Sequence, residues 1–100
     1  MSEAETTSEG ASPALPLLAT LDLSAAEALR RDLATQLSAG GILLDGSAVE
    51  RVATPCLQVL AAAAAMARDS NQTFRLYQAS DALRAATFDL GLNAAIPFED

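Results

Sequence analysis

Lysine and histidine are both missing from this sequence, and their absence limits the chemistry that the chain can perform. The basic side chains are six scattered arginines, so no cluster of cations is available to neutralise a run of phosphates. Without histidine, no nucleophile has a recognisable base beside it. We therefore predict a protein that does not bind nucleic acid and is not an enzyme.

Cysteines, glycine-rich loops and long apolar runs are also scarce. Cys56 is the only cysteine, which excludes an internal disulfide and a multi-cysteine metal site and fits a reducing cytoplasm. The alanine run 61–65 is far shorter than the roughly 20 residues of a membrane span. Residues 1–12 lack the basic and apolar regions of a signal peptide. We expect a cytoplasmic chain with no metal, no cofactor and no direct membrane insertion.

The hydrophobic content is sufficient for one compact domain, because 51% of the 100 residues are hydrophobic. The net charge is −7, but five acidic residues lie near the two ends of the chain and leave only −2 for the rest: Glu3, Glu5, Glu9, Glu99 and Asp100. We expect a disordered acidic tail over residues 1–13, one domain over residues 14–95 and a C-terminal tail over residues 96–100.

The first half of the domain contains signals for a strand and a helix. Residues 15–21 form an apolar stretch that predicts a short first strand. A capping-box pattern from Ser24 to Glu27 begins a helix, and Gly40 and Gly41 end it.

The centre of the chain repeats this alternation. Residues 42–44 are a continuous apolar run, which is typical of a strand buried on both faces of a parallel sheet. Thr54 as the cap and Pro55 at the first helical position then predict a second helix, which should reach about Arg68. Alternating apolar residues predict a strand over Thr73–Tyr77.

A third helix begins at Ser80 and Asp81 and ends at Gly91. The order is therefore strand, helix, strand, helix, strand, helix. Crossovers of this kind are normally right-handed, so the sequence predicts the α/β class, with a small and mostly parallel β-sheet flanked by helices. No glycine-rich phosphate loop follows any of the strands, and nucleotide binding is not predicted.

Four segments together resemble the STAS family, which is named for sulfate transporters and anti-sigma-factor antagonists. They are Leu21-Asp22-Leu23-Ser24, Ile42-Leu43-Leu44-Asp45, Val49-Glu50-Arg51-Val52 and Ala53-Thr54-Pro55-Cys56-Leu57. The resemblance implies a small sheet with helices packed beside it, which agrees with the predicted order of elements. Many members have two strands before the first of these segments, and whether this chain has the first edge strand is left open.

The resemblance also implies a site at the start of the second helix. Pro55 stands where the best-known antagonists carry a phosphorylated serine, and Ala53 replaces the preceding aspartate, so Thr54 is the remaining candidate phosphoacceptor. The partner-binding loop and helix start would consist of Ala53, Thr54, Pro55, Cys56 and Gln58, with Asp22 and Asp45 as flanking acidic residues.

Each of these residues has a structural interpretation as well. Thr54 is equally suited to capping the helix without any regulation. Asp22 and Asp45 stand where turn residues are common, and a lone cysteine such as Cys56 is usually a buried filler.

Two functions follow from the resemblance. The first is a non-enzymatic regulatory module that binds a kinase-like or chemotaxis-related signalling protein and is switched by phosphorylation. The second is a constitutive STAS subunit of a lipid-transport ABC ATPase complex. A lipid or other small-molecule ligand and the oligomeric state are left open by the sequence.

Overall fold

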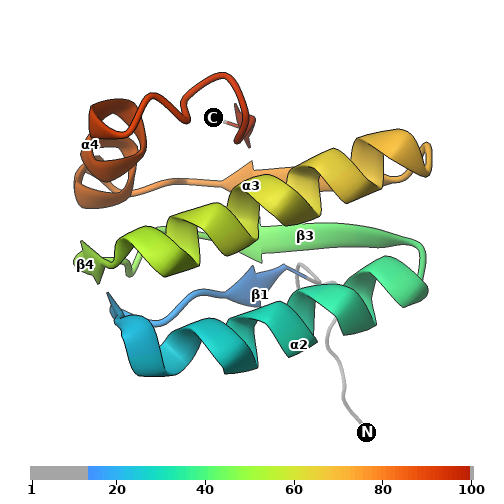
Figure 1. Ribbon diagram of the computed structural model, residues 1–100, viewed down its shortest axis with the longest axis horizontal. Helices are drawn as coiled ribbons and strands as arrows, with labels where there is room; N and C mark the ends of the chain where they lie inside the picture. Colours follow the sequence, from blue (N-terminus) through green and yellow to red (C-terminus); the bar gives the residue numbers. More distant parts are fainter. Residues whose placement is uncertain (1–13, 100) are drawn as a thin grey trace, which may run out of the picture.

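The computed structural model describes residues 14–99, so the expected tail over residues 1–13 lies outside the described residues (Figure 1). Its elements in chain order are β1 (Leu15–Pro16), β2 (Thr20–Leu21), the 3-10 turn η1 (Leu23–Ala25), α2 (Ala26–Ser38), β3 (Gly41–Asp45), β4 (Arg51–Val52), α3 (Thr54–Asp69), β5 (Thr73–Tyr77), α4 (Asp81–Asp89) and β6 (Phe98–Glu99).

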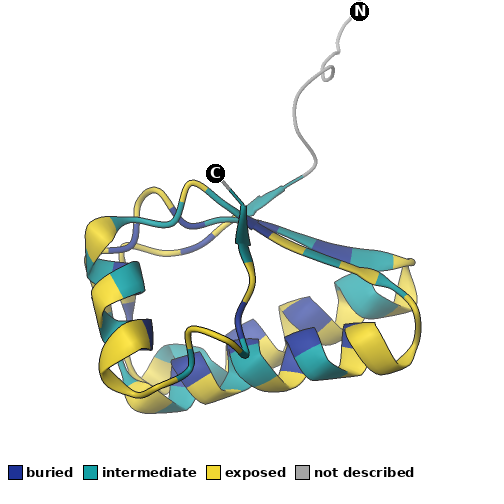
Figure 2. Ribbon diagram, turned by 90° about the horizontal axis from the view of Figure 1, so that it is seen from above, coloured by how far each residue is buried: buried dark blue, intermediate teal, exposed yellow. Residues whose placement is uncertain are grey.

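The strands form one four-stranded sheet in the order β1-β3-β5-β6 and a two-stranded sheet, β2-β4, and every pairing is parallel. Helices α2 and α3 lie side by side against the larger sheet, and α4 lies at one end of it (Figures 1 and 2). The predicted α/β class with a mostly parallel sheet is confirmed.

Within residues 14–99, helices cover one face of the larger sheet and leave the other uncovered (Figure 2). Ile42, Leu44 and Leu76 point to the covered face and are fully buried, whereas Leu43 is only partly buried and its neighbour Arg75 is exposed. The expectation that residues 42–44 are buried on both faces was therefore wrong. Two successive right-handed crossovers that step across the sheet in the same direction place both helices on the same side.

The single strand expected over residues 15–21 is in fact two strands in two different sheets. β1 pairs with β3, and β2 pairs with β4. Between them the chain turns inward at Leu17, which is 4% exposed and whose amide donates to the Asp45 carbonyl at 2.9 Å. Within residues 14–99, β1 is an edge of the larger sheet, and any strand before it would fall outside the described residues.

The described part of the expected C-terminal tail, residues 96–99, belongs to the domain. Ile96 is fully buried, and Phe98 and Glu99 form β6 beside β5. The Arg84 guanidinium lies 5.1 Å from the centroid of the Phe98 ring. The expectation of a tail was wrong because a segment with two large apolar side chains gains more from packing than it loses in chain entropy.

Gly46 joins the loop after β3 to the loop after β5. Its amide donates to the Tyr77 carbonyl at 2.9 Å, and its carbonyl accepts from the Ser80 amide at 3.1 Å. A Cβ at this position would lie 2.9 Å from Leu83 Cδ2 and 3.3 Å from the Ala79 Cα, so a larger residue would force the leucine side chain or the second loop to shift. This contact fixes the loop that leads through β4 to the start of α3.

Burial on one face only can be tested with two neighbouring leucines. We expect Leu44→Ala to lower the free energy of unfolding by about 2 to 5 kcal/mol, because it empties a fully buried site. Leu43→Ala, on the open face, should cost about 1 kcal/mol. Chemical denaturation of both variants measures the difference, and equal losses would show that the second face is also buried.

Candidate functional site

The start of α3 carries the residues that the sequence singled out. Thr54 is the first residue of α3 and is exposed, Pro55 is partly buried, and Gln58 is exposed one turn further on. Ala53 is extended at φ −83° and ψ 152°, and its amide donates to the Leu21 carbonyl at 2.7 Å. The pairing of β2 with β4 therefore holds the start of this helix in place.

Thr54 does not cap α3, contrary to one interpretation of the sequence. The N-cap is Ala53, which has no side chain that could accept a hydrogen bond. The Ala53 carbonyl accepts from the amides of Cys56 and Leu57 at 3.0 and 3.3 Å. Within residues 14–99 the Thr54 hydroxyl makes no hydrogen bond, so it faces solvent without a structural role.

Asp22 acts as a turn residue close to the start of α3. Its carboxylate accepts from the Ser24 hydroxyl at 2.6 Å and from the Ala25 amide at 3.1 Å, and the hydrogen bond from Ser24 is the main cause that lowers its pKa. Its carbonyl accepts from the Cys56 thiol at 3.3 Å. The capping box expected at Ser24 does not form, because Asp22 caps η1 and α2 begins from Ala25 without a side-chain cap.

Asp45 is also a turn residue, and its side chain stabilises the turn that follows β3. Its carboxylate accepts from the Ser47 amide at 2.9 Å, and hydrogen bonds from the Ser47 backbone and side chain lower its pKa. Neither Asp45 nor Asp22 hydrogen-bonds to Thr54 in the described part of the chain. The backbone of Asp22 therefore contacts the start of α3 through Cys56, whereas the Asp45 side chain stabilises only its own turn.

Cys56 lies in the first turn of α3, two residues after Thr54. It is fully buried, and burial, with a smaller contribution from Asp22, raises the pKa of its thiol. Of the predicted partner-binding residues, Ala53, Thr54, Pro55 and Gln58 have some exposed surface, whereas Cys56 has none.

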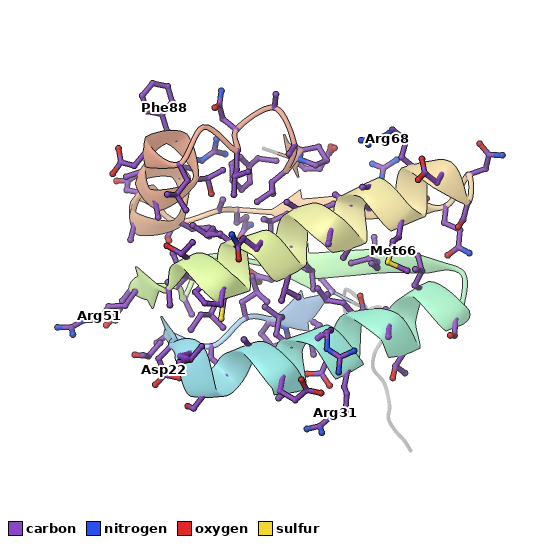
Figure 3. The ribbon with its side chains drawn as sticks, in the orientation of Figure 1. Asp22, Arg31, Arg51, Met66, Arg68 and Phe88 are labelled. Atoms are coloured by element: carbon purple, nitrogen blue, oxygen red, sulfur yellow. The ribbon has the colours of Figure 1, made fainter. Side chains whose placement is uncertain are left out.

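A groove between α2 and α3 extends from this helix start and was not predicted from the sequence. It has a volume of about 630 Å³, and Pro55 and Gln58 line it together with Leu33, Val59 and Met66. Figure 3 shows Met66 toward the far end of α3, on the side of α2. The walls of the groove are mainly apolar, and Arg30, paired with Glu27, is the one charged residue in its lining.

One sequence signal could have indicated this groove. Thr54, Gln58, Ala62 and Met66 are exposed at intervals of four residues and lie on the outer side of α3. None of them is charged, although the surface of a small acidic protein is normally rich in charge. An uncharged outer stripe is typical of a surface that contacts another molecule.

The fold and this site define a small α/β domain with an exposed helix start and an apolar groove, a surface suited to binding. A family model described as Mlab, STAS domain matches residues 4–97, and the chain therefore belongs to the STAS family. In general terms it is a regulatory protein-interaction module. No curated protein matches the chain.

Two negative findings concern the described residues 14–99. Histidine, cysteine, aspartate and glutamate side chains do not gather there in a group of three or more that could hold a metal ion. In the same part of the chain, no helix is long and apolar enough to cross a membrane.

The different roles of the two hydroxyls at helix starts can be measured. We expect Thr54→Ala to change the free energy of unfolding by less than about 0.5 kcal/mol, because the hydroxyl is exposed and unbonded. Ser80→Ala should cost about 1 to 2 kcal/mol, since the Ser80 hydroxyl accepts from the Leu83 amide and donates to the Val49 carbonyl. A similar loss in both variants would restore Thr54 as a cap.

The thiol of Cys56 should be inert in the folded protein. Its burial and raised pKa keep it protonated and inaccessible. At pH 8 we expect Ellman's reagent to react with the native protein much more slowly than with the protein in guanidinium chloride. Equal rates in the two conditions would show that the start of α3 opens readily.

Proposed function

We propose that the chain binds a protein partner through the start of α3 and the adjoining groove, and that phosphorylation of Thr54 controls this contact. The observation that carries the proposal is the exposed, unbonded Thr54 hydroxyl at one end of an uncharged helix face. Pro55 and Gln58 connect that hydroxyl to the groove. A partner seated on the groove would therefore also contact Thr54.

Phosphorylation at this position would act on the contact and leave the fold intact. The added charge is about −2, and the N-terminus of a helix tolerates an anion because of the helix macrodipole. Against a docked partner, the same charge would have to be stripped of water, which weakens binding. A kinase-like partner would supply ATP and the catalytic groups, and this chain would contribute the Thr54 oxygen only.

We propose further that the chain has no catalytic activity of its own and works in the cytoplasm with a signalling partner, as the chemotaxis-associated members of the family do. Within residues 14–99 the site offers an exposed hydroxyl to which no carboxylate or other base is hydrogen-bonded. Such a hydroxyl is suited to receiving a phosphoryl group from another protein.

A second candidate function is a constitutive subunit of a lipid-transport ABC ATPase complex. The apolar groove favours it, because permanent interfaces are more hydrophobic than transient ones. Pro55, at the position of the usual phosphoserine, favours it too. In this case Thr54 would be a contact residue that is never modified.

The switch predicts that a negative charge at position 54 weakens binding. Thr54→Asp should reduce the amount of partner retained from a native cytoplasmic extract tenfold or more, about 1.4 kcal/mol, whereas Thr54→Ser should retain as much as the parent. Thr35→Asp is the matched control, because Thr35 is exposed on α2 and does not line the groove. Quantitative mass spectrometry measures retention, and equal retention by all four proteins would contradict the switch.

The same experiment separates the switch from the permanent subunit. Cleavage at arginine produces the peptide 52–68, in which Thr54 is the only hydroxyl-bearing residue, so a phosphate on that peptide is assigned without ambiguity. Phosphorylated peptide in the unbound pool supports the switch. An ATPase that stays bound through stringent washing, with Thr54 unmodified throughout, supports the permanent subunit instead.

A further inference from the structure

Two exposed apolar side chains lie at the two ends of the groove between α2 and α3. Among residues 14–99, the exposed large apolar side chains are Leu18, Leu23, Met66, Phe88 and Leu90. Met66 is 57% exposed and lines the far end of the groove. Leu23 is 70% exposed and lies in η1, just before Ala26, which lines the end near Thr54. Figure 3 shows Asp22, the neighbour of Leu23, and Met66 at opposite ends of the two helices.

Leu23 has a fixed backbone but is not part of the core. The Asp22 carboxylate accepts from the Ser24 hydroxyl and the Ala25 amide at 2.6 and 3.1 Å. The Asp22 carbonyl accepts from the Cys56 thiol at 3.3 Å, which joins the turn to the first turn of α3. None of these contacts uses the Leu23 side chain. An apolar side chain on a fixed backbone loses little conformational entropy on binding, so Leu23 is suited to contacting a partner.

The surface between these two side chains is too small for a second copy of this chain. From Thr54 to Met66, α3 makes about three turns and covers roughly 18 Å. With helix axes roughly 10 Å apart, the outer side of α2 and α3 over this length is on the order of 400 Å². A stable dimer buries about 800 Å² on each partner. The groove therefore fits a smaller element that a different partner presents.

The walls of the groove determine which form of chain can occupy it. All of its lining residues belong to α2 and α3, so no strand edge is available there. An extended peptide would leave its own backbone groups without hydrogen-bond partners, whereas a helix satisfies them internally. Small side chains also line the groove, namely Ala34, Ala62 and Ala63, and they allow another helix to approach closely.

Charge is confined to one side of the groove. The lining residues that α3 contributes are all uncharged, whereas α2 contributes Arg30, which is paired with Glu27. A charged group pressed against the α3 side would lose water without gaining a counter-charge, which destabilises the contact. The complementary occupant therefore presents an uncharged, apolar face and keeps its charges toward solvent.

A lipid acyl chain is apolar too, but it fits this groove less well. Small-molecule sites bury most of the surface of their ligand. Here Gln58, Ala62 and Met66 are exposed along the groove, so an acyl chain would remain partly in water. An amphipathic helix needs burial on one face only.

We propose that the partner of this chain presents an amphipathic helix of about three turns, whose apolar face occupies the groove and contacts Leu23 at one end and Met66 at the other. This inference rests on the proposed function, because it specifies which part of the partner binds beside Thr54. The apolar residues of that helix recur at every third or fourth position. One end of it lies beside Thr54 and Pro55, where a phosphate on Thr54 would disturb the contact.

Photo-crosslinking locates the segment of the partner that contacts the groove. The photoreactive residue p-benzoylphenylalanine replaces Leu23, Met66 or, as a control, Thr35 in the full chain, which is irradiated in a native cytoplasmic extract. Thr35 is exposed on α2 and does not line the groove. We expect positions 23 and 66 to link to one segment of one partner, at residues about 10 to 12 apart, and position 35 not to link to it. Mass spectrometry of the digested crosslinks identifies the segment.

A fluorescein-labelled synthetic peptide of that segment tests its form and its contacts. We expect the peptide to gain helical circular dichroism when it binds the full chain. Leu23→Ala and Met66→Ala should each weaken binding about tenfold in fluorescence anisotropy. Phe88→Ala is the matched control and should bind like the parent, because Phe88 is an equally exposed apolar residue on α4 (Figure 3). The replaced side chains are all exposed, so the three variants should fold normally.

Several results would overturn the proposal. These are crosslinks from positions 23 and 66 to lipid or to a second copy, a bound peptide that is not helical, and parental affinity in both Leu23→Ala and Met66→Ala. If the parent retains a partner but neither position crosslinks to it, the helix in the groove is wrong and the switch at Thr54 still stands. If the parent retains no partner at all, the proposed function fails together with this inference.

Discussion

The packing of α2 and α3 against a single face of the sheet determines where the other features of the molecule lie. Ile42, Leu44 and Leu76 are fully buried on that face, whereas Leu43 is only partly buried and Arg75 is exposed on the other face, which no helix of residues 14–99 covers. Because both crossovers run the same way across the sheet, the two helices become neighbours. Their outer sides then meet as a groove, which exists only because the two helices are adjacent.

Helix α3 connects the core to the candidate site, and different contacts hold its two ends. At its start, the backbone is fixed by the pairing of β2 with β4 and by the hydrogen bond from the Cys56 thiol to the Asp22 carbonyl. The exposed side chains there, such as Thr54, are therefore not needed to hold the helix in place. At its other end, the left-handed Asn71 and the hydrogen bond from the Gln72 amide to the Ala67 carbonyl close the last turn. The helix is therefore held at both ends, and its exposed residues can face a partner without contributing to the fold.

The sequence predicted the elements that have a strong local signal. Thr54 and Pro55 placed the start of α3 to within one residue, Ser80 placed the start of α4, and the order of apolar segments indicated the parallel sheet. β4 and β6 were missed, and β2 was predicted as part of one strand with β1, because strands of two residues are too short to show alternation and form only through pairing. The groove could not be predicted for a related reason, because it arises from segments that meet only in the folded chain.

The prediction at Thr54 failed by one position, and this shift matters for function. A threonine at the N-cap would place its oxygen over the helix amides, and any modification would then disturb the fold. As the first helical residue, Thr54 leaves that position to Ala53, whose carbonyl accepts from the following amides. Ser80 shows the opposite arrangement, since its hydroxyl is bound on both sides to Leu83 and Val49. A hydroxyl that contributes nothing to the fold can be phosphorylated without unfolding the protein. This is the physical requirement for a residue whose modification affects only the binding of a partner.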